Sequence, residues 1–111
     1  MRNDVTNNDR VNKEIEAFVK VLQRQGIQIS KIILFGSYAR GTADEASDID
    51  LAVLSNNFGK DSIEEAMVLS KLSWQVSDRI EAVPLAPKEI SRLYHPFIGE
   101  IQKYGKVVYA V

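Results

Sequence analysis

Two strand-like stretches on either side of a Gly-Ser turn constrain the fold of this chain most strongly. Residues 27–35 mix β-branched and apolar residues over the length of a strand, and the stretch stops at Gly36. Its last part, residues 32–35, is entirely apolar, which predicts burial on both faces of a sheet. Residues 48–54 alternate in character, so successive side chains should point to opposite faces. One face then carries Ile49, Leu51 and Val53, and the other carries Asp48, Asp50 and Ala52.

The rest of the chain alternates helical and strand-like patterns. Apolar residues recur at helical spacing over residues 9–25, and Gly26 follows where a C-cap glycine would stand. Asp61 and Glu64 form the pattern of a helix N-terminal cap. We expect, in chain order, helices at 9–25 and around 37–40, a helix from 61 to about 77, a strand at 79–86, short helices at 87–93 and near 97–104, and a strand at 106–110. The sequence therefore predicts a small α/β (α+β) domain, a mixed β-sheet with helices packed on it.

Size and composition limit both the architecture and the chemistry. A chain of 111 residues has the size of one compact domain, expected over residues 9–111 after a flexible start at 1–8, so a second substrate-binding domain would come from another chain. The absence of cysteine excludes disulfides, thiolate zinc sites and cysteine nucleophiles. A net charge of -1 gives no reason to expect long-range electrostatic attraction to nucleic acid. Because there is neither a membrane-spanning apolar run nor a signal-peptide pattern, we expect a cytoplasmic protein.

The segment from Gly36 to Asp50 combines groups suited to a phosphate with groups suited to a cation. A Gly-Ser turn between a strand and a helix offers backbone N–H groups and a hydroxyl at the positive end of the helix dipole. Arg40 follows Ser37 by about one helical turn, so its guanidinium can reach the same anion. Asp48 and Asp50 would repel each other there unless cations lie between them. Mg²⁺ meets this need, because it favours one or two protein carboxylates together with phosphate oxygens and water.

These residues resemble the motif of a known superfamily. The GS of residues 36–37, ten intervening residues and the DID of residues 48–50, within GSYARGTADEASDIDLAVL, closely resemble the motif of the nucleotidyltransferases that include DNA polymerase β. The likeness is greatest to the minimal prokaryotic nucleotidyltransferases. It is strongest over residues 32–54 and extends more loosely to the whole chain through the order of helices and strands. The resemblance implies a polymerase β-like nucleotidyltransferase fold.

The resemblance also implies roles for individual residues. By it, Asp48 and Asp50 would hold two Mg²⁺ ions, Gly36 and Ser37 would hold the triphosphate, and Arg40 and Ser47 would support them. The third carboxylate of the family comes from the strand after the next helix, where Glu81 stands in place of a more usual aspartate. Glutamate can bind Mg²⁺ or accept a proton, but its extra methylene moves the charge, and a misplacement of about 1 Å can cost roughly a hundredfold in rate. Asp78 is the alternative ligand, although it should precede the strand.

Arg40 has a simpler alternative role. It could pair with Asp44 or Glu45 at the surface, since exposed opposite charges close in sequence often meet without any function. Phosphate binding and surface pairing both stay open for this residue.

The activity implied by the resemblance is Mg²⁺-dependent transfer of a nucleoside monophosphate, AMP from ATP, to a hydroxyl acceptor with release of pyrophosphate. Minimal members of the family commonly pair with a small all-helical HEPN partner in toxin–antitoxin systems, and some attach AMP to a tyrosine of that partner. We therefore expect a HEPN-type acceptor protein, while self-association stays open. Two alternatives remain: a non-catalytic module of the same fold that binds a nucleotide or a partner, and a small-molecule modifier like the aminoglycoside nucleotidyltransferases, which would need a dimer.

Overall fold

The computed structural model describes residues 9–91 and 97–111, which form one mixed sheet with helices on it. In chain order the elements are α1 (Asp9–Arg24), β1 (Ile29–Phe35), α2 (Ser37–Arg40), β2 (Ile49–Ser55), α3 (Ser62–Trp74), β3 (Ile80–Leu85), the 3-10 helix η1 (Pro87–Ser91), α4 (Ile98–Tyr104) and β4 (Lys106–Ala110). The strands lie in the order β3-β2-β1-β4. Strand β1 is antiparallel to β2 and β4, and β2 is parallel to β3. The α/β fold predicted from the sequence is confirmed.

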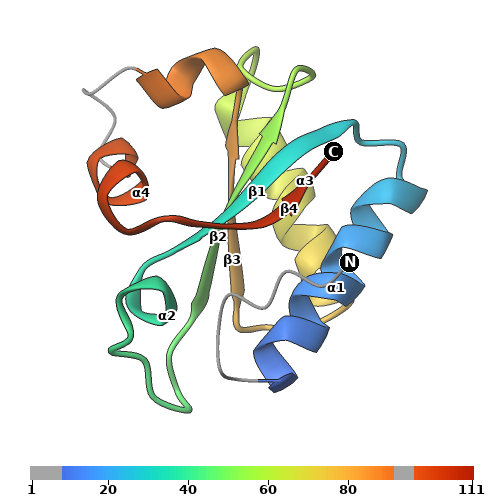
Figure 1. Cartoon of the computed structure of the whole chain (residues 1–111). Helices are drawn as coiled ribbons and strands as arrows, with labels where there is room; N and C mark the ends of the chain where they lie inside the picture. Colours follow the sequence, from blue (N-terminus) through green and yellow to red (C-terminus); the bar gives the residue numbers. More distant parts are fainter. Residues whose placement is uncertain (1–8, 92–96) are drawn as a thin grey trace.

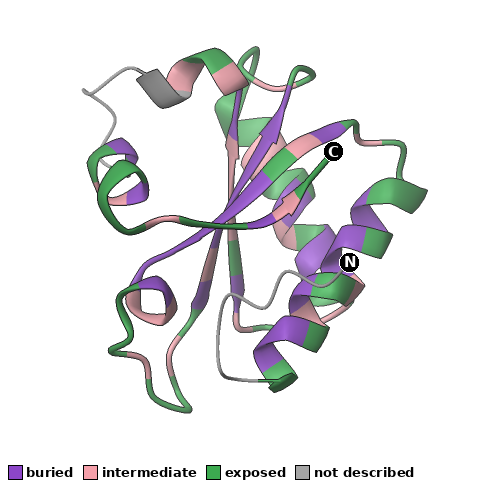
Figure 2. Cartoon of the chain, viewed as in Figure 1, coloured by how far each residue is buried: buried purple, intermediate pink, exposed green. Residues whose placement is uncertain are grey.

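One face of the sheet carries helices α1 and α3 (Figure 1). Its core combines Phe18 and Leu22 of α1, Leu69 of α3, and Leu34 and Leu51 of the two central strands. The strand residues come from alternate positions, and Figure 2 shows both central strands largely buried. Burial of one such side chain contributes about 1.5–3 kcal/mol. This core therefore fixes the central strands, at whose ends the predicted site residues lie.

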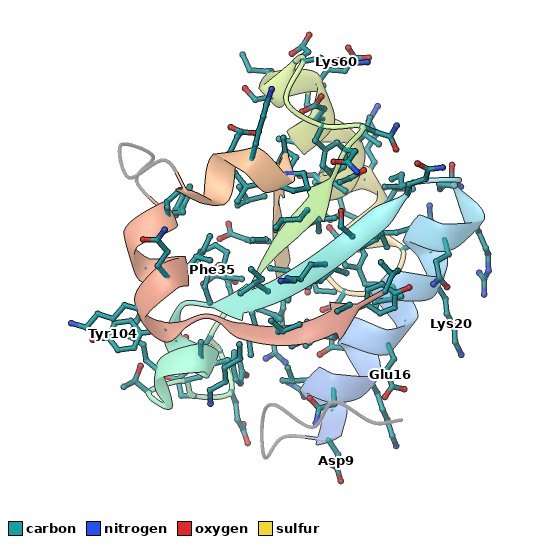
Figure 3. The ribbon with its side chains drawn as sticks, turned by 45° about the horizontal axis from the view of Figure 1, so that its top comes forward. Asp9, Glu16, Lys20, Phe35, Lys60 and Tyr104 are labelled. Carbon is teal, nitrogen blue, oxygen red and sulfur yellow. The ribbon has the colours of Figure 1, made fainter. Side chains whose placement is uncertain are left out.

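The other face carries α4 and η1, and Asp50 points toward it. Ile33 and Phe35 of β1 share a second core with Ile98 and Ile101 of α4. Figure 3 shows Phe35 between the sheet and α4. Phe35 pairs with Asp50 across the β1–β2 ladder, and paired residues point to the same face of a sheet. Asp50 therefore lies at the border of this second core.

The elements lie where the sequence pattern puts them, with shifted boundaries. The helix expected to run to about residue 77 ends at Trp74. Asp61 caps it as predicted, because its side chain accepts a hydrogen bond from the Glu64 N–H at 3.1 Å. The flexible start expected at 1–8 and the end of the helix expected at 87–93 lie outside the described residues. None of the described helices is long and apolar enough to cross a membrane.

Candidate active site

The turn after β1 brings the backbone of a glycine against a carboxylate of β2. Gly36 has φ 75° and ψ -155°, a combination that is almost restricted to glycine. A Cβ at this position would overlap Asp50 Oδ2 and would lie 3.0 Å from Asp50 Cγ. Helix α2 begins at the next residue, the half-buried Ser37. The first N–H groups of α2, which have no partner within the helix, therefore start beside Asp50.

Two of the predicted carboxylates lie side by side on neighbouring strands. Asp50 on β2 pairs in register with Glu81 on the parallel strand β3, so both side chains point to the same face of the sheet. Asp48 directly precedes β2 and is exposed. Asp78, the alternative third carboxylate, is exposed in the turn before β3. The strand pairing thus puts Glu81, and not Asp78, next to Asp50.

Burial and neighbouring negative charge raise the pKa of Asp50 from its ordinary 3.8 to about 6. Desolvation of the half-buried side chain is the largest cause, followed by the charge of Glu81 and the hydrogen bond to it. The charges of Asp48 and Glu100 add to the rise in pKa. Glu100 belongs to α4, and no sequence motif marks it. It joins the carboxylates only because α4 packs on the same face of the sheet.

This set of carboxylates fits a divalent cation. Mg²⁺ prefers oxygen ligands, and a cation beside Asp50 would offset the repulsion that raises the pKa of this residue. Within residues 9–91 and 97–111, no group of three or more His, Cys, Asp or Glu side chains is arranged to hold a metal ion by itself. A bound ion would therefore take one or two carboxylates from Asp48, Asp50 and Glu81, and phosphate oxygens and water would complete its shell.

Arg40 and Ser47 contact protein groups in this structure. Nη1 of Arg40 forms an ion pair with Oε1 of Glu100, so its acidic partner comes from α4 and not from the nearby loop residues Asp44 and Glu45. The Ser47 hydroxyl accepts a hydrogen bond from the Asp44 N–H at 2.9 Å and lies 3.3 Å from Asp44 Oδ1. Ser47 thus closes a turn in the loop between α2 and β2. The phosphate roles of both residues stay predictions.

Arg79, which no motif marks in the sequence, joins the segments that carry the site. Its Nη2 donates to the Tyr38 hydroxyl at 2.6 Å and to the Ser47 carbonyl at 3.3 Å, and its Nε donates to the same carbonyl at 3.4 Å. The guanidinium also lies 6.0 Å from the centre of the Tyr38 ring. The Arg79 carbonyl accepts from the Ile49 N–H at 2.7 Å. One residue therefore connects α2, the loop before β2 and the start of β3.

Arg79→Met should lower the free energy of unfolding by about 2 kcal/mol, because the Ser47 carbonyl and the Tyr38 hydroxyl lose a charged donor. The loss is limited because Arg79 Nη1 is buried with no hydrogen-bond partner among the described residues. Urea unfolding measures the change. The matched control is Arg10→Met, an exposed arginine, which should change stability by less than about 0.5 kcal/mol. Equal effects of the two variants would contradict the role of Arg79 as a connector.

Two comparisons with solved structures show the fold. A Sulfolobus solfataricus protein classed as a nucleotidyltransferase superposes with a TM-score of 0.67 at 20% sequence identity, covering 91% of this chain and 81% of that one. A complex of a tri-AMPylated Shewanella oneidensis HEPN toxin with an MNT antitoxin contains a chain that superposes with a TM-score of 0.59 at 23% identity, covering 91% of this chain and 73% of that one. Both likenesses agree with the polymerase β-like fold predicted from the sequence.

Sequence comparisons identify the family. A Methanocaldococcus jannaschii protein, to which a protein adenylyltransferase activity is attributed, is 35% identical over 105 residues that cover 89% of this chain and 71% of that protein. The profile of the nucleotidyltransferase domain family matches residues 14–108, nearly the whole described chain. The chain therefore belongs to the nucleotidyltransferase domain family, and it is a transferase of nucleotidyl groups.

Proposed function

We propose that this protein transfers AMP from ATP, with Mg²⁺ bound, to a hydroxyl group of a separate protein. One observation carries the proposal: a Cβ at Gly36 would overlap Asp50, which itself pairs with Glu81. A phosphate held at the Gly-Ser turn would therefore lie beside the carboxylates. Phosphate oxygens and carboxylates that share a divalent cation are the arrangement that nucleotidyl transfer needs.

Transfer of AMP forms one phosphorus–oxygen bond and breaks another. The acceptor oxygen would attack the α-phosphorus of ATP, and pyrophosphate would leave with the electron pair of the broken bond. The acceptor hydroxyl must lose its proton, and Glu81, which is exposed beside Asp50 on the neighbouring strand, would accept it. When bound, Mg²⁺ stabilises negative charge on the phosphate oxygens. In this proposal Asp48, Asp50 and Glu81 would hold two Mg²⁺ ions, with one or two carboxylates to each ion, Gly36 and Ser37 would hold the triphosphate, and Arg40 and Ser47 would support it.

We further propose that the acceptor is a tyrosine of a HEPN-type partner, as in a toxin–antitoxin pair. Support comes from two of the proteins compared above. A protein adenylyltransferase activity is attributed to the Methanocaldococcus jannaschii relative, and the Shewanella oneidensis complex contains an AMPylated HEPN toxin together with an MNT antitoxin. The exposure of Asp48 and Glu81 agrees with this, because a side chain of another protein can approach exposed carboxylates.

Intact-mass analysis of both proteins tests the proposal. The chain is incubated with Mg²⁺, each nucleoside triphosphate in turn, and the product of the neighbouring gene. We expect ATP to add the mass of one or more AMP units to the partner, and Asp48→Ala or Glu81→Gln to abolish the gain. The matched control is Asp78→Asn, which changes an exposed aspartate outside β3 and should retain transfer. Nucleotide binding without any mass gain would contradict transfer and favour a binding module.

A further inference from the structure

The ion pair between Arg40 and Glu100 joins two helices that are distant in the sequence. Arg40 is the last residue of α2, the short helix that begins at the Gly-Ser turn. Glu100 lies in the first turn of α4. Their side chains are 35% and 32% exposed, so a dissolved ligand can reach both partners. The pair therefore borders the candidate nucleotide site and is open to solvent.

The packing of α4 fixes the position of Glu100. Ile98 and Ile101, on either side of it in the helix, are buried in the second core together with Phe35. Glu100 is also close enough to Asp50 for its charge to act on that carboxyl group. Glu100 thus extends the acidic set of the site toward α2, and Arg40 is the cation that it binds there.

We propose that Glu100 competes with the triphosphate of the nucleotide for Arg40, so that this ion pair sets the affinity for nucleotide. The inference rests on the proposed function, which brings a triphosphate to the Gly-Ser turn. A guanidinium binds a carboxylate and a phosphate through the same paired N–H groups. A triphosphate at Ser37 that binds the guanidinium through a pair of N–H groups including Nη1 therefore competes with Glu100, which holds Nη1 in this structure.

Isothermal titration calorimetry tests the competition. It measures the affinity of the protein for adenylyl imidodiphosphate, a non-hydrolysable ATP analogue, in the presence of Mg²⁺. Glu100→Gln removes the competing charge and should bind the analogue about fivefold more tightly than the wild type, since exposed ion pairs contribute up to about 1 kcal/mol. Glu100→Asp keeps the charge on a shorter side chain, so its affinity should lie between the two. Glu64→Gln, which removes an exposed charge from the first turn of α3, is the matched control and should leave the affinity unchanged.

A double-mutant cycle separates competition from a general loss of negative charge. If Glu100 acts through Arg40, Glu100→Gln should raise the affinity in the wild type and have no effect in the Arg40→Gln background. A similar gain in both backgrounds, or an unchanged or weaker affinity of Glu100→Gln, would overturn the proposal. If the wild type binds no analogue at all, the proposed function fails first. Thermal melts of each variant confirm that the comparison is made on folded protein.

Discussion

Asp50→Asn should lower nucleotidyl transfer on the order of a thousandfold while making the ligand-free protein harder to unfold. Transfer falls because a neutral amide binds a divalent cation much more weakly than a charged carboxylate does. Stability rises because a charged Asp50 is half-buried beside other carboxylates, which is why its pKa is raised to about 6. The full shift corresponds to about 3 kcal/mol. Because this side chain is partly exposed and solvent screens its neighbours, we expect a gain of about 1 kcal/mol.

The difference in stability between wild type and Asp50→Asn should depend on pH with a defined sign. The folded protein holds the Asp50 proton more tightly than the unfolded chain, where the pKa returns toward 3.8. The stability linked to this proton is therefore fully present below about pH 4 and is lost as the pH rises through about 6. Urea unfolding should show nearly equal stability of the two proteins at about pH 4 and the largest advantage of the variant above about pH 7.

Mg²⁺ supplies the control for this experiment. Added at about pH 7.5, it should stabilise the wild type, because a ligand that binds only the folded state raises the free energy of unfolding, and it should leave Asp50→Asn unchanged. Asp78→Asn should follow the wild type under every condition, since Asp78 lies outside β3. If Asp50→Asn were less stable than the wild type at neutral pH, this would contradict the claim that the charge of Asp50 beside the other carboxylates destabilises the folded protein.

Gly36→Ala should remove both nucleotide binding and much of the stability. The backbone at this position is almost restricted to glycine, and a Cβ would overlap the Asp50 carboxylate, so the turn or the carboxylate must move. Conformational strain and overpacking each cost about 1–3 kcal/mol, and we expect a total loss of about 3 kcal/mol or more. Urea unfolding measures the loss in stability, and titration with the ATP analogue and Mg²⁺ measures the loss in binding.

Gly41→Ala is the matched control for Gly36→Ala. Gly41 also has a positive φ, 78°, but a Cβ there would meet no heavy atom within 4 Å among the described residues. Its substitution should therefore show only the cost of the left-handed backbone, about 1 kcal/mol. If the two alanine variants were equally stable and bound the analogue equally well, close contact between Gly36 and Asp50 would not matter for the site.

The strands and the turn could be predicted from the sequence because their signals are local. Alternation of apolar and acidic residues assigns Asp50 to one face of β2, and that face is the one that meets α4. The order of the elements and the motif together led to Glu81, which the parallel pairing of β2 with β3 then places in register with Asp50. The helical pattern of apolar residues predicts burial less well. Ile63 and Trp74 are large apolar residues of α3, and both are exposed.

Glu100 and Arg79 could not be predicted because their roles depend on packing between distant segments. The spacing of apolar residues predicts α4 as a helix, but it does not say which face of the sheet α4 covers, and that choice brings Glu100 to Arg40. In the sequence Arg79 is an ordinary charged residue at the start of the strand predicted at 79–86. Its contacts with Tyr38 and the Ser47 carbonyl exist only once α2 and the following loop fold back beside β3.

The most direct test of the central claim is anomalous diffraction from crystals grown with Mn²⁺, in place of Mg²⁺, and the non-hydrolysable ATP analogue. The claim is that the Gly-Ser turn and the carboxylates of β2 and β3 form one site for nucleotide and metal. We predict a Mn²⁺ peak bound by Asp48 and Asp50, with the triphosphate at Gly36 and Ser37. A nucleotide bound elsewhere on the protein, with no metal at these aspartates, would contradict the claim.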